Sequence, residues 1–174
     1  MNESSQLPPL RVLFLCTHNS ARSQVAEALL QRKGRGRFEV GSAGTEPAPR
    51  VHPVVVEVLR EQGIDWSGKR PKPISSVWGE PWDFVITVCD RASESCPAFP
   101  RQPTFAHWGI EDPAEASGDE QQRRRAFREA LTYLSRRIDL MLALPFESLA
   151  RRAAEERLNA IGEDTEERPS LRPV

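Results

Sequence analysis

The chain has 174 residues, of which 39% are hydrophobic and 28% charged, as in an ordinary globular domain. Its 24 Lys and Arg residues nearly balance its 25 Asp and Glu residues, so no overall charge would draw it to nucleic acid or to a membrane surface. No apolar run reaches the roughly 20 residues that cross a bilayer, and the polar start "MNESSQLPP" lacks signal-peptide order, so we expect a cytoplasmic protein that binds neither nucleic acid nor membrane.

The hydrophobic pattern predicts strands and helices in alternation. In chain order these are a strand at 12–15, a helix at 23–33, a strand at 37–44, a helix at 53–62, a strand at 83–88, a short helix near 89–96, a strand at 104–108 and a long helix at 119–144. This order predicts an α/β domain with a parallel sheet covered by helices on both faces. Ligands of such sheets bind beyond the carboxyl ends of the strands, so Cys16, Cys89 and Asp112 should open onto one edge.

The remaining segments suggest one domain with additions at its ends. We expect a flexible N-terminal tail at 1–10, the domain itself at 11–145, an additional C-terminal helix at 146–162 and a mobile tail at 163–174. The sequence leaves open whether the additional helix packs on the domain or serves self-association.

The loop "CTHNSARS" at 16–23 lies between the first strand and the first helix. Its amides can form an anion-binding nest, and the helix points its positive end at the same place. This field should make Cys16 partly thiolate near neutral pH, and Arg22 offers a planar fork for two oxygens of a tetrahedral oxyanion. A buried structural cysteine is the alternative. A metal site with His18 is not expected, because the chain has no CxxC or HxxxH partner for it.

This Cys-x5-Arg-Ser pattern resembles the phosphate loop of the low-molecular-weight protein tyrosine phosphatases and of the arsenate reductases built on that fold. "HWGIEDPA" supplies the Asp-Pro pair of the same pattern, at Asp112 and Pro113. The resemblance runs from about Val12 to Leu144 and implies a flavodoxin-like, four-stranded parallel sheet in the order 2-1-3-4. It also implies that the oxyanion is bound by Thr17, His18, Asn19, Ser20, Ala21, Arg22 and Ser23.

A second motif, "VCDRASESCPAFP", holds Cys89 and Cys96. A cysteine pair at this spacing resembles that of thioredoxin-coupled arsenate reductases, whereas phosphatases of this fold need no such pair. If 89–96 is helical, the two cysteines lie ~10 Å apart, and a disulfide needs Cα atoms within roughly 7 Å. Bridging them must then unwind the segment. Two independently buried cysteines are the alternative.

The resemblance therefore implies an oxidoreductase of arsenical resistance. Cys16 attacks arsenic while Asp112 donates a proton, Cys89 attacks Cys16 and releases arsenite, and Cys96 attacks Cys89. Thioredoxin then reduces the redox-active disulfide, with no bound cofactor and no metal. Phosphate or sulfate should mimic arsenate in the loop.

The supporting residues leave alternatives open. Asn19 should lock the loop through its own backbone, and Ser23 should hydrogen-bond the thiolate, cap the helix, or do both. Asp112 could simply start a turn. His107 and Trp108 look like packing residues at a strand end.

Two other functions compete with arsenate reduction. A phosphatase acting on phosphotyrosine or small phosphate esters would need only Cys16, Arg22 and Asp112, and a non-enzymatic anion or redox sensor would need no turnover. Potassium-sensitive reductases of this kind carry an acidic residue where this chain has Lys72, whereas Ser42 and Glu27 fit the other ligand positions. The resemblance thus implies activity that is indifferent to potassium.

Overall fold

The computed structural model describes residues 8–146 and 151–163, without the side chains of residues 151–154. Of the tails expected at 1–10 and 163–174, residues 8–10 and 163 lie within this part of the chain. Both tails were drawn too long there, because Leu10 begins the first strand and Glu163 ends the last helix. None of the helices within it has the length and apolarity that a membrane crossing needs.

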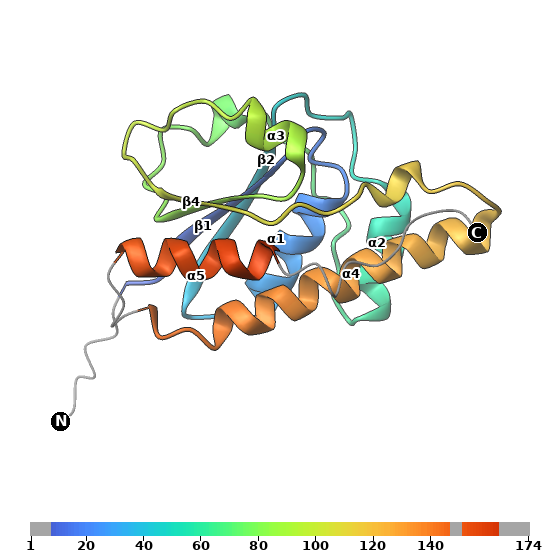
Figure 1. Cartoon of the computed structure of the whole chain (residues 1–174). Coiled ribbons are helices and arrows are strands. Elements are labelled where there is room, and N and C mark those ends of the chain that lie inside the picture. Colours follow the sequence, from blue (N-terminus) through green and yellow to red (C-terminus); the bar gives the residue numbers. More distant parts are fainter. Residues whose placement is uncertain (1–7, 147–150, 164–174) are drawn as a thin grey trace.

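A four-stranded parallel sheet forms the centre of the molecule (Figure 1). Its strands are β1 (Leu10–Cys16), β2 (Phe38–Gly44), β3 (Phe84–Thr87) and β4 (Thr104–His107). They lie in the order β2-β1-β3-β4, so the predicted α/β fold with strand order 2-1-3-4 is confirmed. In the register of the two central strands, Leu15 pairs with Thr87. Because of this pairing, the loops that leave β1 and β3 start side by side.

Alternation along β1 divides the apolar core between the two faces of the sheet. Val12 and Phe14 belong to the larger cluster of buried side chains, whereas Leu13 and Leu15 belong to a smaller one. None of these four side chains is exposed, which explains why the sequence there is continuously apolar.

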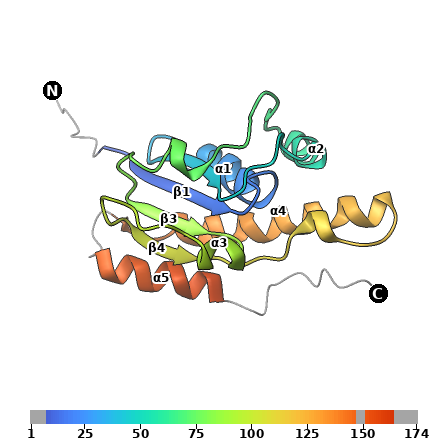
Figure 2. The ribbon, with the colours of Figure 1, turned by 90° about the horizontal axis from the view of Figure 1, so that it is seen from above.

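Helices cover the two faces unequally (Figures 1 and 2). The larger cluster lies under the long helices, which are α1 (Arg22–Lys33), α2 (Pro53–Glu61), α4 (Glu120–Leu142) and α5 (Arg151–Glu163). The smaller cluster is closed by a 3₁₀ turn, η1 (Ile74–Ser76), and by Trp82 and Phe99. Two short elements lie at the carboxyl edge of the sheet: α3 (Asp90–Glu94) and the 3₁₀ turn η2 (Pro113–Glu115).

The additional C-terminal helix packs beside β4 (Figure 2). Leu158 of α5 is fully buried, and its carbonyl oxygen accepts a hydrogen bond from Trp108 Nε1 at 2.8 Å. Gly162 meets the strand end so closely that a Cβ atom there would lie 1.9 Å from the carbonyl oxygen of His107. Of the two roles that the sequence left open for this helix, the structure shows packing on the domain.

Candidate active site

The loop after β1 folds back over its own cysteine. Cys16 is 2% exposed, and its sulfur lies 2.9 Å from Ser23 Oγ and 3.1 Å from the backbone nitrogen of Asn19, which donates to it. Asn19 has φ +49°, the left-handed conformation that asparagine tolerates, and this bend turns its N–H toward the sulfur. A Cβ atom on Gly44 would lie 2.6 Å from the carbonyl oxygen of Thr17, so the loop needs a glycine beneath it.

Asn19 joins this loop to the rest of the fold. Its Nδ2 donates to Ser23 Oγ at 2.8 Å and to Ser42 Oγ at 2.9 Å. Its Oδ1 accepts from the backbone N–H of Lys72 at 2.9 Å. The side chain is fully buried, so these bonds are shielded from water. Asn19 was expected to bond the backbone of its own loop, but its side chain instead bonds one hydroxyl group of that loop and two groups of more distant segments.

The electrostatics of Cys16 differ from the expectation of a thiolate near neutral pH. Burial raises the pKa of the Cys16 thiol above its ordinary value, and the Ser23 hydroxyl, the Ser23 amide and Arg22 only partly offset that rise. Cys89 raises the pKa further. The expectation is therefore wrong for this conformation, because the sulfur lies beneath its loop instead of at an open rim.

Removing the Ser23 hydroxyl should make the thiolate still harder to form. We expect the pKa of Cys16 to rise further in Ser23→Ala, because the hydrogen bond from the hydroxyl group is lost, and alkylation by iodoacetamide at pH 7 to slow roughly tenfold. The rate is read from the peptide that contains Cys16 by mass spectrometry. Ser67→Ala, in an exposed turn where the hydroxyl group bonds Asp65, is the control. An alkylation rate that Ser23→Ala leaves unchanged would show that the hydroxyl has no influence on the sulfur.

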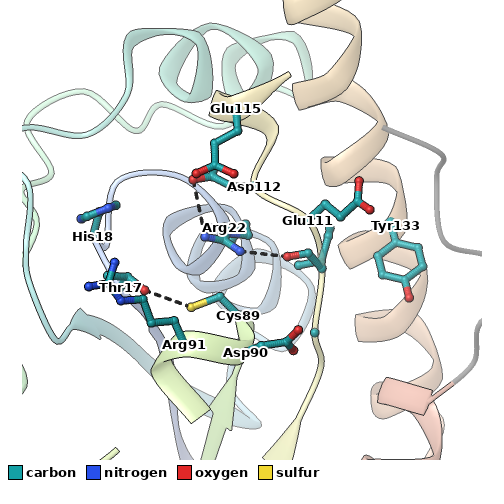
Figure 3. A pocket seen from close by; sticks show the side chains of 12 residues that line it. Thr17, His18, Arg22, Cys89, Asp90, Arg91, Glu111, Asp112, Glu115 and Tyr133 are labelled. Atoms are coloured by element: carbon teal, nitrogen blue, oxygen red, sulfur yellow. Dashed lines mark hydrogen bonds and ion pairs between the residues drawn. The ribbon is translucent and has the colours of Figure 1, made fainter. Parts of the chain in front are cut away.

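Arg22 and Asp112 face each other across the mouth of the site (Figure 3). Arg22 is the first residue of α1, and its Nη1 donates to the carbonyl oxygen of Ile110 at 2.8 Å. Its Nη2 lies 3.6 Å from Asp112 Oδ2. Asp112 also accepts from the backbone N–H of Ala114 and so caps η2. The structure thus gives Asp112 both a turn-starting contact and a position beside the cation.

The second cysteine lies next to the same loop, on the neighbouring strand. Cys89 is the N-cap of α3, and its sulfur lies 3.4 Å from Thr17 Oγ1. It is 3% exposed and faces a cavity of about 410 Å³ together with Arg22 and Asp112 (Figure 3). Cys16, Cys89 and Asp112 were expected to open onto one edge of the sheet. Cys89 and Asp112 do line this cavity with Arg22, whereas Cys16 lies buried beneath its loop and is not among the lining residues.

The third cysteine opens elsewhere. Cys96 follows α3, is partly exposed, and lines a different cavity of about 540 Å³ with Phe105 and His107. Burial also raises the pKa of the Cys96 thiol. All three cysteines are free thiols. The helix expected near 89–96 comprises only Asp90–Glu94, because Cys89 has an extended backbone as the N-cap and the chain leaves the helix at its C-cap, Ser95.

The remaining loop residues have other partners. His18 Nδ1 lies 3.1 Å from the carbonyl oxygen of Glu46, at the outer side of the loop. Ser20 is partly buried, Ala21 is buried, and Ala21 is the N-cap of α1. The sequence reasoning missed several residues that line the cavity, namely Asp90, Arg91, Glu111, Glu115 and Tyr133. The first four lie in or next to the two motifs, so their position in the sequence could have indicated them. Tyr133 belongs to the distant helix α4, and no motif points to it (Figure 3).

Behind the loop, a buried acid lies beside a lysine. Lys72 Nζ is 4.0 Å from Glu27 Oε1, and the Glu27 side chain is 6% exposed. Burial raises the pKa of Glu27, while Lys72 and a hydrogen bond with Ser42 lower it. The three residues that the sequence placed at a cation position therefore do lie together, with the lysine ammonium next to the carboxyl group.

Comparison with known proteins gives consistent matches. The family model described as low molecular weight phosphotyrosine protein phosphatase matches residues 11–155. An arsenate reductase from Halalkalibacterium halodurans is 37% identical over 127 residues, which cover 73% of this chain and 91% of that protein. A glutaredoxin arsenate reductase from Synechocystis is 33% identical over 133 residues, covering 76% and 96% respectively. The structure of a thioredoxin-dependent arsenate reductase from Corynebacterium glutamicum is 34% identical, with a TM-score of 0.56, over 79% of this chain and 64% of that one.

Proposed function

Because the chain belongs to the low molecular weight phosphotyrosine protein phosphatase family, we propose that it is the arsenate-reducing kind of member, an enzyme that converts arsenate to arsenite through three cysteines. One observation carries this proposal. The sulfur of Cys89 lies beside the loop that encloses Cys16, at 3.4 Å from the hydroxyl group of Thr17. Phosphate-ester hydrolysis has no use for a second thiol at that place, whereas reduction requires one.

The first step joins arsenate to Cys16. The oxyanion lies in the loop 16–23, where backbone N–H groups and the Arg22 guanidinium bind its oxygens. Because burial raises the pKa of Cys16, we assign the proton of that thiol to an oxygen of the arsenate dianion. The sulfur then forms a bond to arsenic, and an As–O bond breaks. Asp112 protonates the leaving oxygen, which departs as water.

The second step reduces arsenic. Cys89 attacks the sulfur of Cys16, and an S–S bond forms while the electron pair of the S–As bond passes to arsenic. The proton of the Cys89 thiol goes to an oxygen of the departing arsenite. The Thr17 hydroxyl group lies 3.4 Å from the Cys89 sulfur, and the backbone N–H of Ala92 in α3 donates to the same sulfur at 3.4 Å, so both contacts hold Cys89 in place beside the loop. Cys96 then attacks Cys89, and Cys16 is released as a thiol that takes up the proton lost by Cys96. The Cys89–Cys96 disulfide holds the oxidising equivalents of one arsenate.

An external dithiol must supply two electrons to that disulfide. We assign this role to a thioredoxin, because Cys96 is more exposed than the other two sulfurs and the relay ends on a protein disulfide. Three working thiols require a reducing compartment, so we assign the enzyme to the cytoplasm.

A coupled assay tests the proposed function. The protein is supplied with arsenate, thioredoxin, thioredoxin reductase and NADPH, and in a parallel reaction with glutaredoxin, glutathione, glutathione reductase and NADPH. We expect sustained arsenite formation in the first mixture. Sustained formation in the second mixture alone would overturn the choice of thioredoxin, and no arsenite in either would overturn the reductase.

Potassium should have no effect on this activity. The Lys72 ammonium lies beside the buried carboxyl group of Glu27 and supplies the positive charge at that place. We therefore expect kcat/KM to change by less than about twofold when sodium is exchanged for potassium at constant ionic strength. A several-fold rate increase in potassium would contradict this role of Lys72.

A further inference from the structure

Three side chains outside the reaction scheme form a hydrogen-bonded chain at the carboxyl edge of the sheet. His107, the last residue of β4, has its Nδ1 2.7 Å from Thr87 Oγ1 and its Nε2 2.7 Å from Asp90 Oδ1. Thr87 is the last residue of β3, and Asp90 is the first residue of α3. The imidazole of His107 therefore connects two strand ends to the helix that follows Cys89.

The tautomer of His107 sets the donor and acceptor roles in this chain. When the hydroxyl group of Thr87 donates to Nδ1, the proton of His107 lies on Nε2, from which it donates to Asp90. Gly109 leaves the necessary space, since a Cβ atom there would lie 2.8 Å from Asp90 Oδ1 and 2.9 Å from His107 Nε2.

The added helix α5 supports the same strand end. The backbone N–H of His107 donates to Asn159 Oδ1 at 2.9 Å, and the neighbouring Trp108 bonds the carbonyl oxygen of Leu158. The side chain of Asp90 is 85% exposed, so little other than His107 restrains it. Motion of α3 is therefore opposed by His107, whose backbone is in turn held by α5.

We propose that His107 is a positioning residue of the thiol relay. Its hydrogen bond with Asp90, here called the latch, holds the first turn of α3 in the reduced protein and breaks when Cys96 reaches Cys89. This inference rests on the proposed function. Cys89 and Cys96 face different cavities, and a disulfide requires their Cα atoms within roughly 7 Å. A helix of five residues is too short to be stable by itself, so an outside contact matters to it.

The latch has a measurable redox consequence. Formation of the Cys89–Cys96 disulfide oxidises two thiols and passes two electrons and two protons to oxidised dithiothreitol, which becomes reduced. Because the latch stabilises only the reduced, helical state, its loss shifts this equilibrium toward the protein disulfide. We expect a shift of about 3- to 10-fold for one such hydrogen bond, which corresponds to a potential roughly 14 to 30 mV more negative.

The experiment uses the full chain with Cys16→Ser, so that only Cys89 and Cys96 can pair. The equilibrium with dithiothreitol is measured for this parent, for His107→Ala, for Asp90→Ala and for the double variant. Asp90 also carries a charge at a helix start, so the cycle of four isolates the coupling between the two side chains. Asp65→Ala, another exposed acid with a turn contact, is the matched control. His107→Gln keeps an N–H near the position of Nε2.

We expect the double variant to shift no further than Asp90→Ala alone, His107→Gln to recover most of the parent value, and Asp65→Ala to change nothing. Amide hydrogen exchange in α3 should accelerate by the same 3- to 10-fold in the reduced His107→Ala protein. An unshifted potential with unshifted exchange, or additive effects of the two substitutions, would overturn the latch alone. Absence of any Cys89–Cys96 disulfide in the parent would overturn the proposed relay and the latch together.

Discussion

Replacing Cys89 with serine is expected to abolish arsenite formation while the hydrolysis of p-nitrophenyl phosphate continues at nearly the parent rate. Hydrolysis uses Cys16, Arg22 and Asp112, whereas the electron pair for arsenic depends on an attack by Cys89 on the Cys16 sulfur. We expect arsenite formation to fall by at least about a thousandfold, since a serine hydroxyl cannot take over that covalent step. Serine is a favourable helix N-cap, so α3 should remain folded.

Cys96→Ser is the matched comparison for that experiment. It retains the first two sulfurs, so each molecule should release one arsenite and then stop as a Cys16–Cys89 disulfide. Both assays follow arsenite per enzyme over time. Sustained arsenite formation by the Cys89→Ser protein would contradict the proposed relay. A parent protein that hydrolyses the ester but never reduces arsenate would be a phosphatase.

Substituting Arg22 with lysine should weaken both reactions together. The two ends of the Arg22 fork have different partners: Nη1 bonds the carbonyl oxygen of Ile110 and Nη2 faces Asp112. A lysine ammonium keeps the charge but cannot reach two oxygens of a tetrahedral ion in one plane. We expect kcat/KM to fall by about 100- to 1000-fold for arsenate reduction and for ester hydrolysis alike.

The control for Arg22→Lys is Arg32→Lys in the same helix, whose Nη1 bonds the carbonyl oxygen of Gly63 in an exposed position. It should leave both rates within about twofold. A fall of less than threefold in Arg22→Lys would show that a single positive charge suffices and that the fork has no special function.

Local sequence patterns predict the fold because they depend on neighbouring residues. The continuous apolar runs of β1 and β3 belong to strands buried on both faces, and the β1 run leads directly into the cysteine loop. The strand order brings Cys16 and Cys89 to neighbouring strand ends, so the two motifs and the expected topology together suffice to pair these sulfurs.

Contacts between distant segments do not follow from such local patterns. The sequence suggested packing for His107, yet its imidazole bonds Thr87 and Asp90, which lie 20 and 17 residues away. The burial of Cys16 depends on how deeply its loop folds, and that depth is set by Asn19 with Ser42 of the neighbouring strand. The docking of α5 depends on the fit of Gly162 against the end of β4, for which periodicity carries no signal.

The central claim is that one arsenate drives a disulfide through three sulfurs in a fixed order. Its most direct test is mass spectrometry of the protein quenched with acid and alkylated at intervals after mixing with one equivalent of arsenate. We expect a Cys16–Cys89 disulfide first and a Cys89–Cys96 disulfide later, with arsenite formed in step with the first. A protein whose three thiols all remain alkylatable after arsenite has formed, or whose first disulfide joins Cys89 to Cys96, would contradict the account.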